Sequence, residues 1–285
     1  MCPSPGTEGV ARGYVIPIGG AEDKLRNPTI LKRFVDLCGS QDARIIVIPT
    51  ASRLDDTGPL YVELFKELGA GDVVSIRIET RIDANREDYI KELERADGVF
   101  ITGGNQLRLS TILGGTPVAQ AIRKLNANGT HIAGTSAGAA IMPEHMIAGG
   151  AGGSTPREDG VNLAPGLGLT NSLIIDQHFR QRDRLGRLLS ALSYNPFVTG
   201  IGLDEDTAAF INPEGVFDVV GSGAITIVDP SRLQYSSMGQ VDSGDAVSLI
   251  GMSLHILADG GRYDTVLRIA SMGNINAEAM QENSD

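Results

Sequence analysis

Short runs of apolar, β-branched residues alternate along the first half of the chain with segments whose apolar positions recur at helical spacing. Such runs are typical of buried parallel strands, because a strand covered on both faces shows no polar alternation. Strands are predicted in GYVIPIGG, ARIIVIPTAS, DVVSIRIET, GVFITGGNQ and THIAGTSAGAAI. Helices are predicted in NPTILKRFVDLC, PLYVELFKELGA, NREDYIKELERAD and TPVAQAIRKLNANG. These alternations predict an α/β fold with a doubly wound, mostly parallel sheet.

Helix-start signals and loop positions follow from the same pattern. Asn27 is expected to cap the first helix with Pro28 at its first position, and Pro117 is expected at the start of the fourth helix. In a doubly wound sheet, the loops at the carboxyl ends of the strands form the binding site. Those loops are GGAEDK, PTASRLDD, TGGNQ and GTSAG, and we expect them to converge.

The second half of the chain has a different character. The segment 148–160, AGGAGGSTPREDG, lacks apolar periodicity and is predicted to be a long flexible loop, either a surface insertion or an active-site flap. A further strand is predicted in SLIIDQHF and an arginine-rich helix in RQRDRLGRLLSALSY. The remaining short strands and tight turns predict an antiparallel extension on the sheet edge. With no repeat or linker visible, we expect one catalytic domain over residues 13–271, a flexible tail at 1–12 and a frayed tail at 272–285.

Composition places the chain among ordinary globular proteins. Of its 285 residues, 41% are hydrophobic and 21% are charged, and no apolar run is long enough to cross a bilayer. The N-terminal segment lacks the basic and then apolar regions of a secretory signal. Cys2 and Cys38 are too few for a disulfide framework. We therefore expect a cytoplasmic protein.

Charge narrows the possible partners only slightly. Acidic residues outnumber basic residues by 35 to 24, which disfavours nucleic acid as a partner and suits a cationic substrate. An acidic surface is equally typical of a soluble protein with no such substrate, so charge alone identifies nothing. The four histidines and two cysteines are scattered along the chain, so we expect no metal and no cofactor. Neither nucleic acid nor a membrane is an expected partner.

The segment GTSAG, from Gly134 to Gly138, fits the G-x-S-x-G pattern of a nucleophile elbow, in which a strained serine stands between a strand and a helix. An apolar run precedes Ser136 and small helix-forming residues follow it, as an elbow requires. The alternative is a glycine-rich turn that binds phosphate at a helix N-terminus, but no lysine precedes the serine as in a P-loop. The sequence therefore predicts Ser136 as a nucleophile.

A serine nucleophile needs a base, and four histidines are candidates. His131 enters the strand before the elbow, where packing or capping is expected, His145 lies beyond the elbow helix, and His255 belongs to a distant hairpin. His178 ends a predicted strand at the same sheet edge as Ser136, so it is the predicted base. The carboxylate that orients the imidazole is left open among several acidic residues. They are Asp176, Asp183, Asp204, Glu205 and Asp206.

Two backbone amides are expected to stabilise the oxyanion of an acyl-transfer intermediate. The amide of Ala137 directly follows the nucleophile. The loop TGGN supplies the second amide from Gly103 or Gly104, because glycine allows close approach of the backbone. The sequence pattern does not distinguish these two glycines, and we predict Gly104 as the second donor.

Five segments spread along the chain carry a combined pattern: TGGNQLRL, AGTSAGAA, APGLGL, DQHFRQRDRLGRL and GIGLDEDTA. Together they resemble the cyanophycinases, within the serine peptidase family that also contains aspartyl dipeptidase (peptidase E). The likeness extends from about residue 13 to about residue 269, and DQHFRQRDRLGRL is its most specific segment. The resemblance implies a flavodoxin-like fold related to class I glutamine amidotransferases, with serine in place of the cysteine nucleophile.

By motif, the resemblance places a catalytic triad on Ser136, His178 and Glu205, which selects Glu205 among the open carboxylates. It also implies a set of substrate-binding residues: Gln106, Asp176, Gln177, Arg182, Arg184 and Arg187. The arginines could bind free carboxylates through forked hydrogen bonds. Without the resemblance they are better explained as a solvated helix face paired with acids such as Asp183. Asn105 departs from the family pattern, in which aspartate precedes the glutamine.

The resemblance implies an exopeptidase activity on cyanophycin, a poly-aspartate chain with arginine joined to each side-chain carboxyl. Hydrolysis of its backbone amides through an acyl-enzyme would release β-Asp-Arg dipeptides, and the family also implies a homodimer. One alternative is an aspartyl dipeptidase that acts on small Asp-X peptides. Another is a non-catalytic binding protein in which Ser136 marks a ligand cradle. A glutamine amidotransferase is disfavoured because neither cysteine lies in an elbow.

Overall fold

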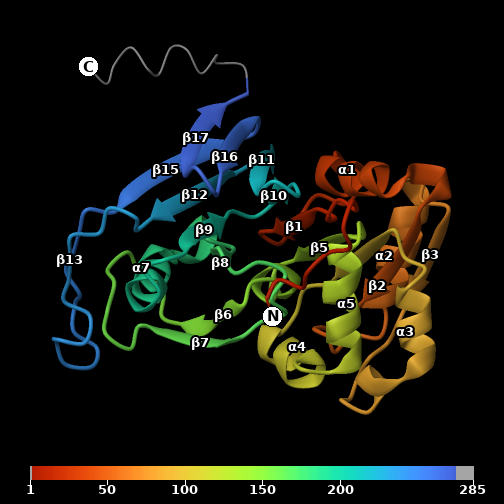
Figure 1. Cartoon of the computed structure of the whole chain (residues 1–285), viewed down its shortest axis with the longest axis horizontal. Coiled ribbons are helices and arrows are strands. Elements are labelled where there is room, and N and C mark those ends of the chain that lie inside the picture. The colour runs from red at the N-terminus through yellow and green to blue at the C-terminus, as the bar shows by residue number, and fades with distance from the viewer. Residues whose placement is uncertain (1, 274–285) are drawn as a thin grey trace.

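The computed structural model describes residues 2–273 and is built around a nine-stranded sheet (Figure 1). Five neighbouring strands are parallel, in the order β1-β5-β4-β2-β3. Their bounds are β1 Val15–Ile18, β2 Arg44–Ile48, β3 Asp72–Ser75, β4 Gly98–Ile101 and β5 His131–Thr135. The β1 edge continues antiparallel through β10 Thr207–Ile211, β11 Val216–Gly221, β16 Gly261–Asp264 and β17 Ile269–Met272. The predicted parallel sheet and its antiparallel extension are confirmed.

Helices cover both faces of the parallel strands, which explains their uninterrupted apolar pattern. Along β2, Ile45 and Val47 join the core beneath one pair of helices, while Ile46 and Ile48 join the core beneath the others. The first face carries α1 Thr29–Cys38 and α2 Thr57–Glu67. The second carries α3 Glu87–Leu93, α4 Gln106–Leu113, α5 Pro117–Ala127 and α6 Ala137–Ala140.

Helix starts agree with the sequence signals in one case and differ in another. Pro117 occupies the first turn of α5, and Thr116 caps that helix by accepting a hydrogen bond from the amide of Ala119 at 3.4 Å. Pro28, however, is the N-cap of α1 rather than its first residue, so the prediction of Asn27 as the cap was one residue too early. Helix α4 was not predicted, because its eight residues are too few to show a clear period.

Four of the ten strands from β8 to β17 form a separate sheet, in the order β15-β12-β9-β8. Its members are β8 Leu173–Gln177, β9 Thr199–Leu203, β12 Ala224–Asp229 and β15 Ser253–Ala258, with β8 and β9 parallel. Helix α7, Leu185–Tyr194, packs on this sheet. The antiparallel extension of the large sheet therefore contains only some of the late strands, because the chain passes from the smaller sheet to the larger one between β9 and β10. Strand pattern alone does not encode the partner strand.

The segment predicted as a loop over 148–160 is shorter than expected and is attached to its surroundings. Its first residues belong to β6 His145–Gly150, which pairs with β7 Val161–Pro165 in a ribbon that runs below α7 in Figure 1. The connection between them is held near α7, where the amide of Gly153 donates to Asp183 O at 2.6 Å and that of Arg157 to Ser190 Oγ at 3.0 Å. The arginine-rich helix is also shorter than predicted, since residues 180–182 form a 3-10 turn before α7 begins.

The remaining elements are short. They are the strands β13 Tyr235–Ser236 and β14 Leu249–Ile250 and the 3-10 turns η1 Ser40–Asp42, η2 Asp83–Asn85 and η3 Arg180–Arg182. The segment predicted as an N-terminal tail makes contacts with α5 and its end, including a bond from the Thr7 amide to Asn128 Oδ1 at 3.1 Å. Most of the predicted C-terminal tail, from residue 274, lies outside the described residues. Over residues 2–273, no helix has the length and apolar character needed to span a membrane.

Candidate active site

Ser136 stands at a sharp turn between β5 and α6. Its backbone has φ 52° and ψ −109°, a conformation that L-residues rarely adopt. The flanking glycines make this turn possible: a Cβ on Gly134 would lie 2.7 Å from the backbone of Gly138, and one on Gly138 would lie 2.1 Å from Ile101 O. The geometry is that of a nucleophile elbow, with a strained serine between a parallel strand and a helix.

Two hydrogen bonds join Ser136 to a histidine and a carboxylate. Ser136 Oγ lies 3.0 Å from His178 Nε2, and His178 Nδ1 lies 2.6 Å from Glu205 Oε1. His178 follows the last residue of β8, and Glu205 lies in the turn between β9 and β10, so two sheets contribute to the arrangement. Of the other histidines, His131 accepts a hydrogen bond from the Tyr14 amide at 3.1 Å, in the packed position expected from the sequence.

The competing carboxylates are engaged elsewhere. Asp204 is buried and accepts a hydrogen bond from the Arg180 amide, and Asp206 accepts one from the Asp23 amide at 2.8 Å. Asp176 is likewise buried, in an ion pair described below. Glu205 has a side chain that is 37% exposed. Among the acidic residues left open by spacing, Glu205 is the one that contacts His178.

Residues at the end of β1 form backbone hydrogen bonds with the segments that carry Ser136, His178 and Glu205. Successive carbonyl groups of residues 18, 19 and 20 accept hydrogen bonds from the amides of Ser136, His178 and Asp206, at 2.9, 2.8 and 2.8 Å. Gly20 has φ 99°, and a Cβ there would lie 2.4 Å from Cε1 of the His178 ring. The imidazole therefore packs directly on the backbone of this loop, which only glycine permits.

The surroundings of His178 favour its neutral form. Burial lowers the pKa of His178 below its ordinary value of 6.5, while the hydrogen bond that its Nδ1–H donates to Glu205 opposes this shift. The charges of Arg182 and Arg184 lower the pKa further. A neutral imidazole at pH 7 can accept a proton from a neighbouring hydroxyl, and the carboxylate of Glu205 can stabilise the imidazolium that results.

Three amides near Ser136 are available to a ligand. The backbone N–H groups of Gly103, Gly104 and Ala137 donate no hydrogen bond to any residue between 2 and 273. A Cβ on Gly103 would lie 3.4 Å from Ser136 Cβ, whereas one on Gly104 would meet Ala51 O at 2.3 Å. The TGGN loop thus lies against the serine, and both glycines remain candidates for the second oxyanion donor.

The residues predicted to bind substrate differ in how accessible they are. Gln177 is buried and accepts a weak hydrogen bond from Ser136 Oγ at 3.4 Å, and Gln106 Nε2 donates to Ala148 O at 3.2 Å. Arg182 is exposed and lies next to this region in the chain. Asn105, the departure from the family pattern, caps α4 by accepting from the Arg108 amide at 3.0 Å. An aspartate could make the same bond.

Asp176 and two of the predicted arginines instead bind one another. Arg187 Nε donates to Asp176 Oδ2 at 2.6 Å and its Nη2 donates to Oδ1, while Arg184 Nη1 lies 3.5 Å from the same carboxylate. All three side chains are at least nine-tenths buried. Burial lowers the pKa of Arg184 to about 10, so it stays charged at neutral pH. The forked contact between Asp176 and Arg187 leaves these groups occupied inside the protein.

Sequence reasoning missed Glu22, a buried carboxylate beneath the elbow. It accepts hydrogen bonds from Tyr61 Oη and Thr135 Oγ1 and lies 2.8 Å from Lys24 Nζ. Thr135 immediately precedes the serine, so Glu22 ties the β1 loop to the end of β5. An acidic residue in a loop ordinarily indicates a solvent-exposed position, and no local signal marks this one as buried.

The chain is similar to known peptidases over most of its length. The model of the peptidase family S51 matches residues 15–219. The chain is 44% identical over 255 residues to the cyanophycinase of Geminocystis herdmanii (strain PCC 6308), covering 89% of this chain and 94% of that protein. It is 43% identical over 251 residues to the cyanophycinase of Trichormus variabilis (strain ATCC 29413 / PCC 7937), covering 87% and 84%. A solved peptidase from an acI-B1 Actinobacterium shares the fold, with a TM-score of 0.65, 19% identity and coverage of 90% and 98%.

Proposed function

The chain belongs to peptidase family S51, and we propose that it is a serine-type exopeptidase that hydrolyses cyanophycin to β-Asp-Arg dipeptides. The observation that carries the proposal is the hydrogen-bonded series of Ser136, His178 and Glu205, with its distances of 3.0 and 2.6 Å. Similarity to proteins named cyanophycinase along nearly the whole of their length supports the choice of substrate.

In the proposed mechanism, His178 Nε2 takes the proton of Ser136 as Oγ attacks a backbone carbonyl of the polymer. The amide of Ala137 and an amide of the TGGN loop, with Gly104 as the working choice, stabilise the resulting oxyanion. His178 then protonates the leaving amine. In the second half of the reaction His178 takes a proton from the water that attacks the acyl-enzyme, and it returns a proton to Ser136 Oγ as the acyl group leaves. Glu205 keeps the imidazole oriented and stabilises its charged form. These steps need no metal and no organic cofactor.

In this proposal, only some of the predicted substrate-binding residues contact the polymer, and the others position the surrounding segment. Arg182 and the amide of Gln106 would meet the polymer, and Gln177 would do so beside the serine. Asp176, Arg184 and Arg187 would act mainly by fixing the segment between β8 and α7, because their charged groups are directed at one another. A homodimer and a cytoplasmic location complete the proposal and rest on the family resemblance and composition alone.

The test is incubation of the purified protein with insoluble cyanophycin, in parallel with Ser136→Ala, followed by mass spectrometry of the soluble products. We expect β-Asp-Arg from the wild type and none from the variant. Cleavage of small Asp-X peptides without release from the polymer would move the activity to an aspartyl dipeptidase. Binding of the polymer with no turnover by either protein would favour a non-catalytic role.

A further inference from the structure

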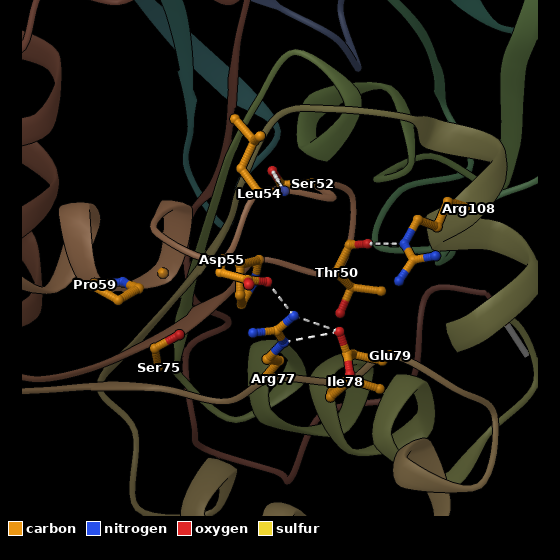
Figure 2. A pocket seen from close by; sticks show the side chains of 12 residues that line it. Thr50, Ser52, Leu54, Asp55, Pro59, Ser75, Arg77, Ile78, Glu79 and Arg108 are labelled. Atoms are coloured by element: carbon orange, nitrogen blue, oxygen red, sulfur yellow. Dashed lines mark hydrogen bonds and ion pairs between the residues drawn. The ribbon is translucent and has the colours of Figure 1, made fainter.

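A small polar cavity lies beside the candidate active site, at the carboxyl ends of β2 and β3. Its volume is about 50 Å³, and Figure 2 shows its walls from close by. The loop after β2 supplies Thr50, Ser52 and Asp55, the segment after β3 supplies Arg77, and α4 supplies Arg108. In a sheet of this kind, ligands bind at this edge. The proposed chemistry at Ser136 uses none of these residues.

Thr50 carries an unpaired polar group into this cavity. The residue is only 3% exposed, and its Oγ1 has no hydrogen-bond partner among residues 2–273. Its carbonyl oxygen accepts from Arg108 Nε at 2.8 Å, and in Figure 2 the hydroxyl points to the other side, toward Arg77 and Glu79. A buried hydroxyl without a partner is unfavourable, so the site is incomplete without a bound group.

The cavity is lined by two carboxylates and two guanidinium groups, and one of these guanidinium groups forms no ion pair within residues 2–273. Arg77 lies between two carboxylates, 2.5 Å from Asp55 and 2.7 Å from Glu79, and these hydrogen bonds raise its pKa. Arg108, by contrast, forms no ion pair with any residue between 2 and 273. With Nε engaged by Thr50 O, its terminal nitrogens remain as donors. Arg108 and Thr50 line the same cavity, and the terminal nitrogens of Arg108 and Thr50 Oγ1 have no partner among residues 2–273, which favours a carboxylate ligand between them.

The cavity shares a wall with the loop that faces the serine. The amide of Asn105 donates to Ala51 O at 3.0 Å, and a Cβ on Gly104 would lie 2.3 Å from the same oxygen. Gly103, the preceding residue, packs against Ser136. Thr50 and Ser52 flank Ala51 in the chain, so the TGGN loop contacts the wall of the cavity at Ala51 and the nucleophile at Gly103.

We propose that this cavity is a subsite for the free α-carboxylate of an arginyl side chain, on a polymer unit next to the one being cleaved. In cyanophycin each arginine is joined through its α-amino group, so every repeat carries a free α-carboxylate. Arg108 and Thr50 Oγ1 donate to its two oxygens. A volume of about 50 Å³ accommodates a carboxylate but not a whole arginine side chain, which then extends outward past Asp55. This inference rests on the proposed function.

The test compares Thr50→Val and Arg108→Gln with the wild type on two substrates. One is a long polymer, and the other is the two-unit oligomer, which has one unit on each side of the cleaved bond and none beyond. We expect KM for the polymer to rise about tenfold, the loss of one hydrogen bond to a charged group, with kcat unchanged. On the two-unit oligomer both variants should match the wild type. Thr111→Val, whose hydroxyl bonds Leu107 O within α4 outside the cavity, is the matched control.

A binding measurement separates the two proposals. In a Ser136→Ala background, which removes the proposed nucleophile, calorimetry with a four-unit oligomer should show weaker binding when Thr50→Val is added. The Ser136→Ala protein without the second substitution should show the same weakening when the arginines of the outer units of the oligomer carry α-carboxamides instead of α-carboxylates. If the wild type cleaves polymer and both variants keep its KM, the cavity holds water only and the subsite is overturned. If the wild type cleaves neither substrate, the proposed function fails and the subsite with it. Thr50→Val should not lower Tm, because the hydroxyl has no partner to lose among residues 2–273.

Discussion

The contact between Gly20 and the His178 ring gives a sharp test of how the proposed base is positioned. In Gly20→Ala, the new Cβ would lie 2.4 Å from Cε1 and 2.5 Å from Nε2 of the imidazole. Ordinary contact requires about 3.5 Å, so the ring must move by about 1 Å. That displacement breaks the 3.0 Å hydrogen bond with Ser136 Oγ. A misplacement of about 1 Å in a reacting group can lower kcat by about 100-fold.

Backbone strain must be separated from displacement of the ring, and Gly69 provides the matched control. Its φ of 97° nearly equals the 99° of Gly20, but nothing lies within 4 Å of the position that its Cβ would take. Alanine at either position should cost about 1–2 kcal/mol for the left-handed backbone. Urea denaturation should report that loss in both variants, whereas only Gly20→Ala should lose kcat on cyanophycin. If Gly20→Ala keeps the kcat of the wild type, the loop does not position His178 as described.

Three further predictions concern charged groups. The pKa of His178 is lowered and its neutral form is the proposed base, so kcat/KM should rise with pH below pH 6.5 and then become constant. Glu205→Gln removes an interaction that raises this pKa. A pH–rate series on that variant should therefore show the rise at lower pH, and kcat should be about 10⁴-fold smaller. Asp176→Asn leaves the buried Arg187 without its counter-charge, and urea denaturation should show a loss of about 3–5 kcal/mol. Glu22→Gln weakens the acceptor of three donors, and the same assay should show a loss of about 1–3 kcal/mol together with a lower kcat.

Those parts of the fold that depend on local pattern could be predicted from the sequence. The five parallel strands appear as apolar runs because each is buried on both faces, and the elbow appears as GTSAG because its crossing backbones admit only glycine around Ser136. The pairing of the late strands could not be predicted in the same way. Both β9 and β10 are buried and apolar, yet they enter different sheets, since the turn at 204–206 redirects the chain between them.

The identity of the carboxylate that contacts His178 shows a second limit of sequence reasoning. Spacing leaves Asp204, Glu205 and Asp206 equivalent candidates, and the family resemblance selected Glu205. In the structure, Asp204 accepts a hydrogen bond from the Arg180 amide and Asp206 accepts one from the Asp23 amide, both from distant parts of the chain. The choice is therefore made by competition for hydrogen bonds in three dimensions, which no local pattern records.

The same reasoning explains why the short end of β1 matters more than its sequence suggests. Ser136 comes from the nine-stranded sheet, whereas His178 and Glu205 lie at the ends of strands in the four-stranded sheet. Carbonyls of residues 18, 19 and 20 bond the amides of Ser136, His178 and Asp206, and the Glu22 carboxylate binds Thr135 from the same loop. One loop of five residues thus binds elements of both sheets at the site. Changes there should alter all three catalytic candidates together, whereas changes at the far ends of the sheets should alter stability alone.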